Sequence, residues 1–228
     1  NRNPTSLTLT NQLIKLRAMK PKPGIEGADV RERLLDAAVQ LFAEQGVAGT
    51  AVAEIAAAAG VTSAMVHYYF KTKDQLLDAV VEGRLVGRFI AYIGTEMEDF
   101  RGDPFAITRH LVAQIVAASE RMPWLAPLWV REVASEGGAL REKLICRVDR
   151  DKQARYRAAI EAGQKRGEVN ADVQPQLMFM SIMGLTMLPL SVIKSWEKIP
   201  IIGKLRKQDL EKHVVALLMH GLSVPKTE

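Results

Sequence analysis

Cysteine and catalytic motifs are nearly missing from this chain, and both absences narrow what it can do. Cys146 is the one cysteine among 228 residues, which excludes an internal disulfide and a zinc site built from several cysteines. A glycine-rich GxGxxG loop, an HExxH metal motif and a GxSxG nucleophile motif do not occur in the sequence. We therefore expect no enzyme, no bound metal and no cofactor.

Targeting signals and long uncharged runs are also scarce. The N-terminal residues lack the basic, apolar and small-residue regions of a secretory signal peptide, and we expect a cytoplasmic protein. The run Leu177 to Ile193 has 17 residues without a charge, and a membrane-spanning helix needs ~20. It also contains Gly184 and Pro189. We therefore expect no membrane span, and interpret the run as a helix buried in a core or a subunit interface.

Basic residues outnumber acidic residues only slightly, 31 to 26, which gives a net charge of +5. The excess lies mainly in residues 1–28, which hold five basic residues and one acidic residue, whereas residues 29–75 hold four and six. A basic N-terminal extension can be a solvated tail or an arm that contacts DNA, and both interpretations stay open. Overall charge is thus weak support for nucleic-acid binding, which has to rest on a motif.

Strand signals are nearly absent after residue 28, since no stretch sustains an apolar–polar alternation and no Asn-Gly or Asp-Gly turn occurs. Apolar residues instead recur at helical spacing, as in Val30, Leu34 and Ala38, and Gly46 is placed to end this first helix. The pattern predicts an all-α fold. The expected helices cover about 29–45, 52–59, 63–70, 73–100, 124–135, 139–166, 173–195 and 207–221, and a further helix opens at Pro104.

The segment from Thr50 to Lys73 contains a short connection between two short helices. Gly60, Val61 and Thr62 form this three-residue turn, as in a helix-turn-helix. Gly60 can adopt the left-handed conformation that ends the first helix, and Thr62 can cap the next one.

The second helix of this motif has two distinct faces. Val66, Tyr69 and Phe70 lie three and four residues apart and form an apolar stripe toward the core. The opposite face carries small or hydrogen-bonding side chains, namely Ser63, Ala64, His67 and Tyr68. Such a face suits insertion into the major groove of DNA, because small residues allow close approach and polar groups can donate to phosphates.

The motif resembles the DNA-binding domain of TetR-family transcriptional regulators. The residues that carry the resemblance are Ala37-Ala38, Leu41-Phe42, Gly46, Thr50, Ile55-Ala56, Ala59-Gly60-Val61, Tyr68-Tyr69-Phe70, Lys73 and Leu76-Leu77. One departure is Ala51, where the family often has a serine or threonine that caps the second helix. Either Thr50 takes over this role or the cap is lost.

The resemblance implies a fold of two parts and a set of DNA-contacting residues. A helix-turn-helix domain would occupy residues 29–75, after the basic extension at 1–28, and an effector-binding and dimerisation domain would occupy 76–228. The positions that match DNA contacts are Thr50, Thr62, Ser63, Ala64, His67, Tyr68 and Lys73.

Methionine and tryptophan are abundant in the C-terminal part, where such regulators bind their effectors. Flexible thioethers and large rings tolerate varied ligands, so we expect a largely apolar pocket, although each residue could equally be ordinary core. The candidate lining residues are Met122, Trp124, Trp129, Met178, Met183 and Met187. In the last helix an apolar stripe is expected at a homodimer interface: Leu210, Val214, Leu217, Leu218 and Gly221.

These expectations combine into one function. The resemblance implies a dimeric repressor that binds a palindromic double-stranded operator and releases it when a small, apolar effector binds. The long helix that starts at Lys73 would carry the signal between the two sites. The alternative that stays open is a DNA-binding protein without an effector.

Overall fold

The computed structural model describes residues 26–94, 100, 102–147, 150–196 and 203–225. These residues form helices and turns, with one isolated backbone bridge between Val169 and Ser223. The all-α prediction is therefore confirmed. The basic extension lies outside the described residues up to position 25.

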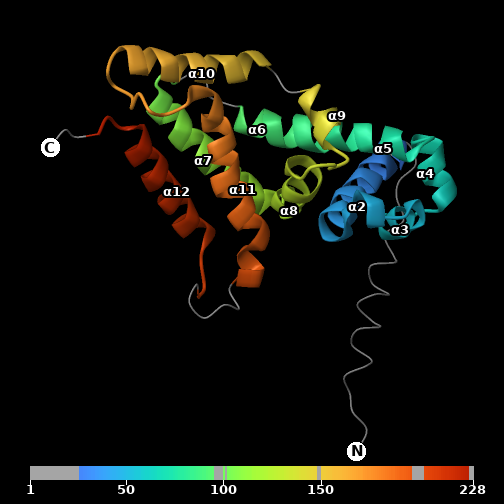
Figure 1. Cartoon of the computed structure of the whole chain (residues 1–228). Helices are drawn as coiled ribbons and strands as arrows, with labels where there is room; N and C mark the ends of the chain where they lie inside the picture. Colours follow the sequence, from blue (N-terminus) through green and yellow to red (C-terminus); the bar gives the residue numbers. More distant parts are fainter. Residues whose placement is uncertain (1–25, 95–99, 101, 148–149, 197–202, 226–228) are drawn as a thin grey trace, which may run out of the picture.

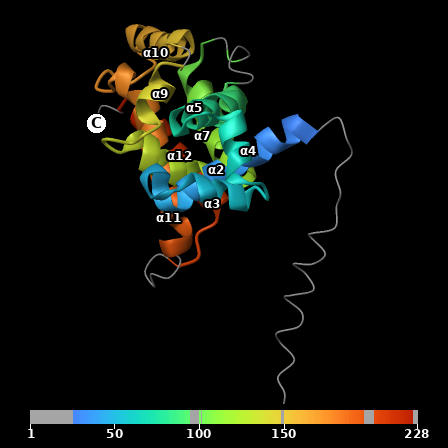
Figure 2. The same cartoon turned by 90° about the vertical axis from the view of Figure 1, so that its right-hand side faces the viewer.

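Three helices group at one end of the molecule (Figure 1) and face the viewer in Figure 2. They are α2 (Glu26–Gly49), α3 (Val52–Ala58) and α4 (Ser63–Tyr69). Gly46 interrupts α2 with φ 81° and ψ 162°, a backbone conformation that glycine adopts at little cost. The predicted end of the first helix at Gly46 is thus confirmed as a sharp bend, after which one short turn leads to Gly49.

A long helical rod leads away from these three helices. It consists of α5 (Lys73–Val80), the π-helical segment η1 (Val81–Ile90) and α6 (Ala91–Ile93). A Cβ atom on Gly87 would lie 2.9 Å from the Glu82 carbonyl oxygen, so glycine permits the wide turn here. The rod ends at Ile93, with Gly94 as its cap, several residues before the end near residue 100 that the sequence predicted.

The remaining helices build a second bundle. They are α7 (Pro104–Arg121), α8 (Leu125–Trp129), η3 (Val130–Ala134), α9 (Arg141–Ile145), α10 (Arg150–Lys165), η4 (Pro175–Leu177), α11 (Met178–Trp196) and α12 (Lys207–Leu222). Pro104 opens α7 as predicted, and the Asp103 carboxylate accepts the Phe105 N–H at 2.9 Å. The expected single helix over 139–166 is wrong, because a turn at Cys146 and Arg147 separates α9 from α10.

Helix α12 packs against α7 and α11 (Figure 1), and this packing divides its apolar residues. Leu210, Val214 and Leu218 are buried inside their own chain, whereas Leu217 and Gly221 are exposed. The single interface stripe predicted from the sequence is therefore wrong. Helical spacing cannot separate a face that packs on the same chain from a face that packs on a partner, since both are apolar.

Helix α11 is the apolar run noted in the sequence. Among the described residues, the segment Pro175–Ile193 is long and apolar enough to cross a bilayer, with a mean hydropathy of 1.7, and 39% of it is buried. It packs against α7, α8 and α12. Its inner side belongs to the core, and its outer side keeps apolar residues exposed, as at Met180 and Leu188.

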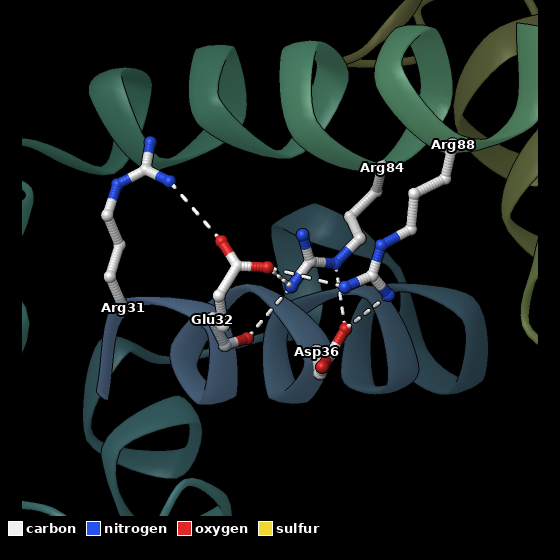
Figure 3. Close-up of polar contacts among 5 residues, drawn as sticks. All are labelled: Arg31, Glu32, Asp36, Arg84 and Arg88. Carbon is white, nitrogen blue, oxygen red and sulfur yellow. Dashed lines mark hydrogen bonds and ion pairs between the residues drawn. The ribbon is translucent and has the colours of Figure 1, made fainter. Parts of the chain in front are cut away.

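A buried arginine joins α2 to the rod (Figure 3). The Arg84 side chain is 1% exposed, and its Nε donates to Asp36 Oδ1 at 2.7 Å. One terminal nitrogen of Arg84 donates to the Glu32 carbonyl at 2.9 Å and lies 3.0 Å from the Glu32 carboxylate. Arg88 reaches the same two carboxylates at 3.2 and 3.3 Å, from the surface. Arg84 thus bonds to two successive turns of α2 through Nε and one terminal nitrogen.

We expect Arg84→Met to lower the free energy of unfolding by about 1–3 kcal/mol, because it removes charge-assisted hydrogen bonds in a buried setting. Asp36 and Glu32 are about half exposed, so water can solvate the carboxylates that remain. The matched change Arg88→Gln removes surface ion pairs and should cost about 1 kcal/mol or less. Urea denaturation of both variants measures the difference. Equal losses would contradict the central role of Arg84.

A second set of ion pairs joins the short helix α9 to α5. Lys143 Nζ lies 2.7 Å from Asp74 Oδ1 and 3.2 Å from Asp78 Oδ1, and Arg147 lies 2.9 Å from Asp78. The hydrogen bond from Lys143 lowers the pKa of Asp78 below its ordinary 3.8, against the opposing effect of burial. The hydrogen bond to Asp74 raises the pKa of Lys143.

Because the folded pKa of Asp78 is lowered, its stabilisation is complete above the unfolded pKa and disappears as pH falls through the folded pKa. We expect the unfolding free energy of the wild type to fall more steeply around and below pH 3.8 than that of Asp78→Asn. Denaturation at a series of pH values tests this, with Asp172→Asn as an exposed control. High salt should shrink the difference. Parallel profiles for wild type and Asp78→Asn would count against the link.

Candidate nucleic-acid interface and ligand cavity

The turn between α3 and α4 has the geometry that the sequence predicted. Gly60 is left-handed with φ 69°, and the Val61 N–H donates to the Ala56 carbonyl at 2.9 Å. Thr62 occupies the N-cap position of α4 with extended backbone, and its side chain makes no capping hydrogen bond. The Thr62 hydroxyl therefore stays exposed and available to a ligand.

Helix α4 lies at the end of the molecule (Figure 1), and one of its faces is exposed. The exposed side chains are Thr62, Ser63, Ala64, His67 and Tyr68. Tyr68 is 76% exposed, whereas Phe70 is 4% exposed. The Tyr68 ring meets the Tyr69 ring edge to face at 5.2 Å, which orients the phenol outward. Hydroxyl, imidazole and phenol groups can all hydrogen-bond phosphates or base edges.

Thr50 and Lys73 differ from these five residues, because their side chains bond within the protein. Thr50 is 2% exposed, and its hydroxyl donates to the Gly46 carbonyl at 2.6 Å. Lys73 Nζ donates to the carbonyls of Val47 and Thr50 at 2.6 and 2.7 Å. Both residues hold the connection from α2 to α3 in place, and the Lys73 ammonium retains one further donor.

The cap of α3 comes from Glu54 rather than from Thr50. The Ala51 N–H donates to the Glu54 carboxylate at 2.7 Å, which is the reciprocal half of a capping box. The N-cap side chain supplies no acceptor, because alanine has none. Ala51 therefore costs α3 one of the two usual capping bonds.

Glu132 of η3 contacts the last turn of α2 directly, which sequence reasoning did not predict. Its carboxylate is 7% exposed and accepts the Val47 N–H at 2.9 Å and the Ala139 N–H at 3.1 Å. The Val47 peptide is thus held on its N–H by Glu132 and on its carbonyl by Lys73. A single glutamate between Arg131 and Val133 carries no motif that would have revealed this contact.

Two cavities lie in the second bundle. The larger of these two has a volume of about 660 Å³, opens to the surface and is lined by α8, η3, α9, α10, η4 and α11. The smaller, of about 70 Å³, is also partly open and is lined by the rod, α7, α8, α10 and α11. Trp129, Gln153, Tyr156 and Phe179 line both, so the two cavities adjoin along a shared wall. The larger volume is in the range of small-molecule sites.

The residues expected to line a pocket divide between cavity wall and core. Trp129 lines both cavities and Met183 lines the larger one. The other four are buried and line neither of these two cavities: Met122, Trp124, Met178 and Met187. The wall of the larger cavity also differs from the expected apolar lining, since it includes Arg141, Arg150 and Arg157.

Residues 34–80 match the sequence family described as bacterial regulatory proteins, tetR family. The chain is 25% identical over 195 residues to the HTH-type transcriptional repressor KstR2 of Rhodococcus jostii, covering 86% of this chain and 92% of that protein. It is 33% identical over 102 residues to the HTH-type transcriptional regulator AcrR of Shigella flexneri. That match covers 44% of this chain and spans only 46% of the AcrR protein.

Solved structures share the fold over most of the chain. The hemolysin II transcriptional regulator HlyIIR superimposes with a TM-score of 0.62 at 20% identity, covering 88% of this chain and all of that one. The regulator AibR, solved with isovaleryl coenzyme A and operator DNA, superimposes with a TM-score of 0.60 at 20% identity. That match covers 82% of this chain and 97% of AibR.

We expect Tyr68→Ala to weaken binding to a cognate DNA site by about 1–3 kcal/mol, the usual value of one specific contact. Its phenol is exposed, so the free energy of unfolding should change by about 0.5 kcal/mol or less. Phe70→Ala is the matched core change, and it should lower the unfolding free energy by about 3–5 kcal/mol. Fluorescence anisotropy with labelled duplex and urea denaturation measure the two effects. Undiminished DNA binding by folded Tyr68→Ala would remove Tyr68 from the interface.

Proposed function

Because this chain belongs to the TetR family of bacterial regulatory proteins, it is a DNA-binding transcriptional regulator and not an enzyme, and we propose that it acts as an effector-responsive, dimeric repressor. The observation that carries the proposal is the exposed face of α4 above a buried core. The relative KstR2 is named a transcriptional repressor, and its match to this chain covers 92% of KstR2. We propose that the protein described here acts in the cytoplasm, where promoter DNA is found.

Direct DNA contact is proposed for the exposed side chains of Thr62, Ser63, Ala64, His67 and Tyr68. For Thr50 and Lys73 we propose a supporting role, since their hydrogen bonds hold the α2–α3 connection next to the recognition turn. In this arrangement residues 29–75 bind DNA, and residues 76–228 provide the effector and dimer surfaces.

A dimer is supported by the outer faces of α11 and α12. Large apolar side chains are exposed there, namely Met180, Leu185, Leu188 and Leu217, and Leu177 is exposed at the end of the preceding η4. Around Gly184 and Gly221, no atom lies within 4 Å of the position a Cβ atom would take, which leaves room for a close partner. Two-fold pairing of these faces would set two α4 helices for half-sites in successive major grooves, about 34–36 Å apart.

The two cavities support an effector site, and two links support its coupling to DNA. Glu132 lies in η3 between the cavity-lining residues Trp129 and Val133, and bonds Val47. Helix α9 lines the cavity through Leu144 and is tied to α5 through Lys143. A ligand that moves η3 would therefore act on Val47 in the last turn of α2, and a ligand that moves α9 would act on α5. The structure of AibR holds an acyl coenzyme A together with operator DNA.

We expect the double variant Leu188→Glu/Leu217→Glu to be a folded monomer near 25.2 kDa, because it places charges on the exposed apolar faces. The wild type should have twice this mass by analytical ultracentrifugation. Tyr68→Glu changes an exposed large side chain on α4, outside α11 and α12, and should remain dimeric. The monomer should also lose DNA affinity, because half-sites are then bound singly. A dimeric double variant would refute this interface.

The proposed function is tested by recovering DNA bound to the purified protein from fragmented genomic DNA of its source. We expect enriched fragments to contain two inverted half-sites near a promoter, and transcription from that promoter in vitro to fall when the protein is added. Increased transcription would identify an activator instead. Recovery of fragments without any common site would contradict a sequence-specific regulator.

A further inference from the structure

The wall of the larger cavity carries cationic side chains and no acidic one. Three of its lining residues are arginines, and none is an aspartate or glutamate. The smaller cavity likewise has no acidic lining residue. A cationic wall beside a cavity of about 660 Å³ favours an anionic occupant.

The three arginines approach the larger cavity from two helices. Arg150 and Arg157 lie seven residues apart on α10, on the face that also carries Gln153, and Arg141 comes from α9. The side chains of Arg141 and Arg150 form no ion pair or hydrogen bond with the part of the chain that the structure describes. Arg157 pairs with Glu161 at 3.4 Å, and both side chains are about half exposed. Arg141 and Arg150 thus keep their planar donor forks available for a carboxylate or phosphate.

The smaller cavity, which lies on the other side of the shared wall, is lined mainly by apolar side chains. Phe89, Ile93 and Leu111 form its sides, next to the Trp129 ring. Tyr156 lies between the two cavities, and its hydroxyl forms a hydrogen bond of 2.6 Å with the Thr108 hydroxyl. Burial raises the pKa of Tyr156 to about 12, so the phenol remains neutral at physiological pH and adds no negative charge to the wall.

We infer that the adjoining cavities bind an amphipathic anion, with its apolar end beside Phe89 and Trp129 and its carboxylate or phosphate at Arg141 and Arg150. The role of this ligand as the effector rests on the function proposed above, whereas its chemical class rests on the cavity walls. This ligand class differs from the small, apolar effector expected from the sequence by its anionic head group.

The anion would bind next to a helix that already contacts the DNA-binding end. Arg141 and Lys143 lie two residues apart on α9, and Lys143 is bonded to Asp74 and Asp78 of α5. An anion that neutralises Arg141 would therefore change the position or the net charge of α9, the helix that forms ion pairs with α5. The ion pairs of Lys143 thus connect an anionic head group at Arg141 to α5, whose first residue is Lys73.

The chemical class is tested with four probes of equal chain length, below their micelle concentrations: dodecanoate, dodecyl phosphate, dodecan-1-ol and dodecyltrimethylammonium. Titration calorimetry and intrinsic tryptophan fluorescence, to which Trp129 contributes, report binding to the full chain. We expect at least one anion to bind about tenfold or more tightly than the alcohol, and the cation to bind most weakly. The tighter anion identifies the preferred head group. Shortening the chain of the carboxylate should weaken binding by about threefold to fourfold per methylene.

The arginine contacts are tested with Arg141→Gln/Arg150→Gln, a change of exposed side chains that should leave the fold intact. It should weaken the tighter anion about tenfold or more and leave dodecan-1-ol unchanged. The matched control is Lys165→Gln, which removes an exposed cation of the same helix outside both cavities. Equal affinity for alcohol and anions, or an unchanged affinity in the arginine variant, would overturn the inference.

Failure of the ligand class and failure of the proposed function give different results. If a probe anion binds through the arginines but leaves the affinity for a selected DNA site unchanged, the ligand class stands and the effector role is wrong. If the protein binds its DNA site while all four probes fail to bind, the regulator stands and the amphipathic anion is wrong.

Discussion

The arrangement of the two helical groups depends on the backbone N–H and the backbone carbonyl of Val47. Its N–H donates to Glu132 at 2.9 Å, and its carbonyl accepts from Lys73 at 2.6 Å. The backbone bends at Gly46, and the Val47 carbonyl accepts the Thr50 N–H at 3.3 Å in addition to Lys73. A backbone N–H or carbonyl left unpaired here would be costly, because Val47 is buried. The connection from α2 to α3, which positions α3 and α4, is therefore bonded directly to Glu132 of the C-terminal bundle.

Sequence reasoning identified the helix-turn-helix because its signals are local. Gly60 must adopt positive φ, and the spacing of Val66 and Phe70 determines which face of α4 is buried, so the exposed position of Tyr68 follows. Pro104 and Gly46 likewise mark helix boundaries through their own backbone preferences. Where backbone conformation and one helical face decide the outcome, the residues themselves contain the information.

The parts that escaped prediction depend on contacts between distant segments. The interface stripe of α12 was wrong because Leu218 is buried within the chain while the adjacent Leu217 is exposed, and periodicity treats both alike. Met187 is core and Trp129 is cavity wall, although both are large apolar residues in the same region. Glu132 meets Val47 across 85 positions of sequence, and its burial becomes visible only in the fold. Packing assigns these roles, and composition does not.

Hydrogen–deuterium exchange with and without a selected operator duplex tests most directly whether the Val47 contact joins the DNA-binding helices to the cavity. Linkage requires that, if the cavity affects DNA binding, DNA binding affects the cavity wall. The expected result is altered exchange in α4 and at Val47, and also in η3 and α9, which no DNA can touch from the face of α4. Changes confined to residues 52–70, with unaltered exchange at Val47 and in η3 and α9, would contradict the coupling.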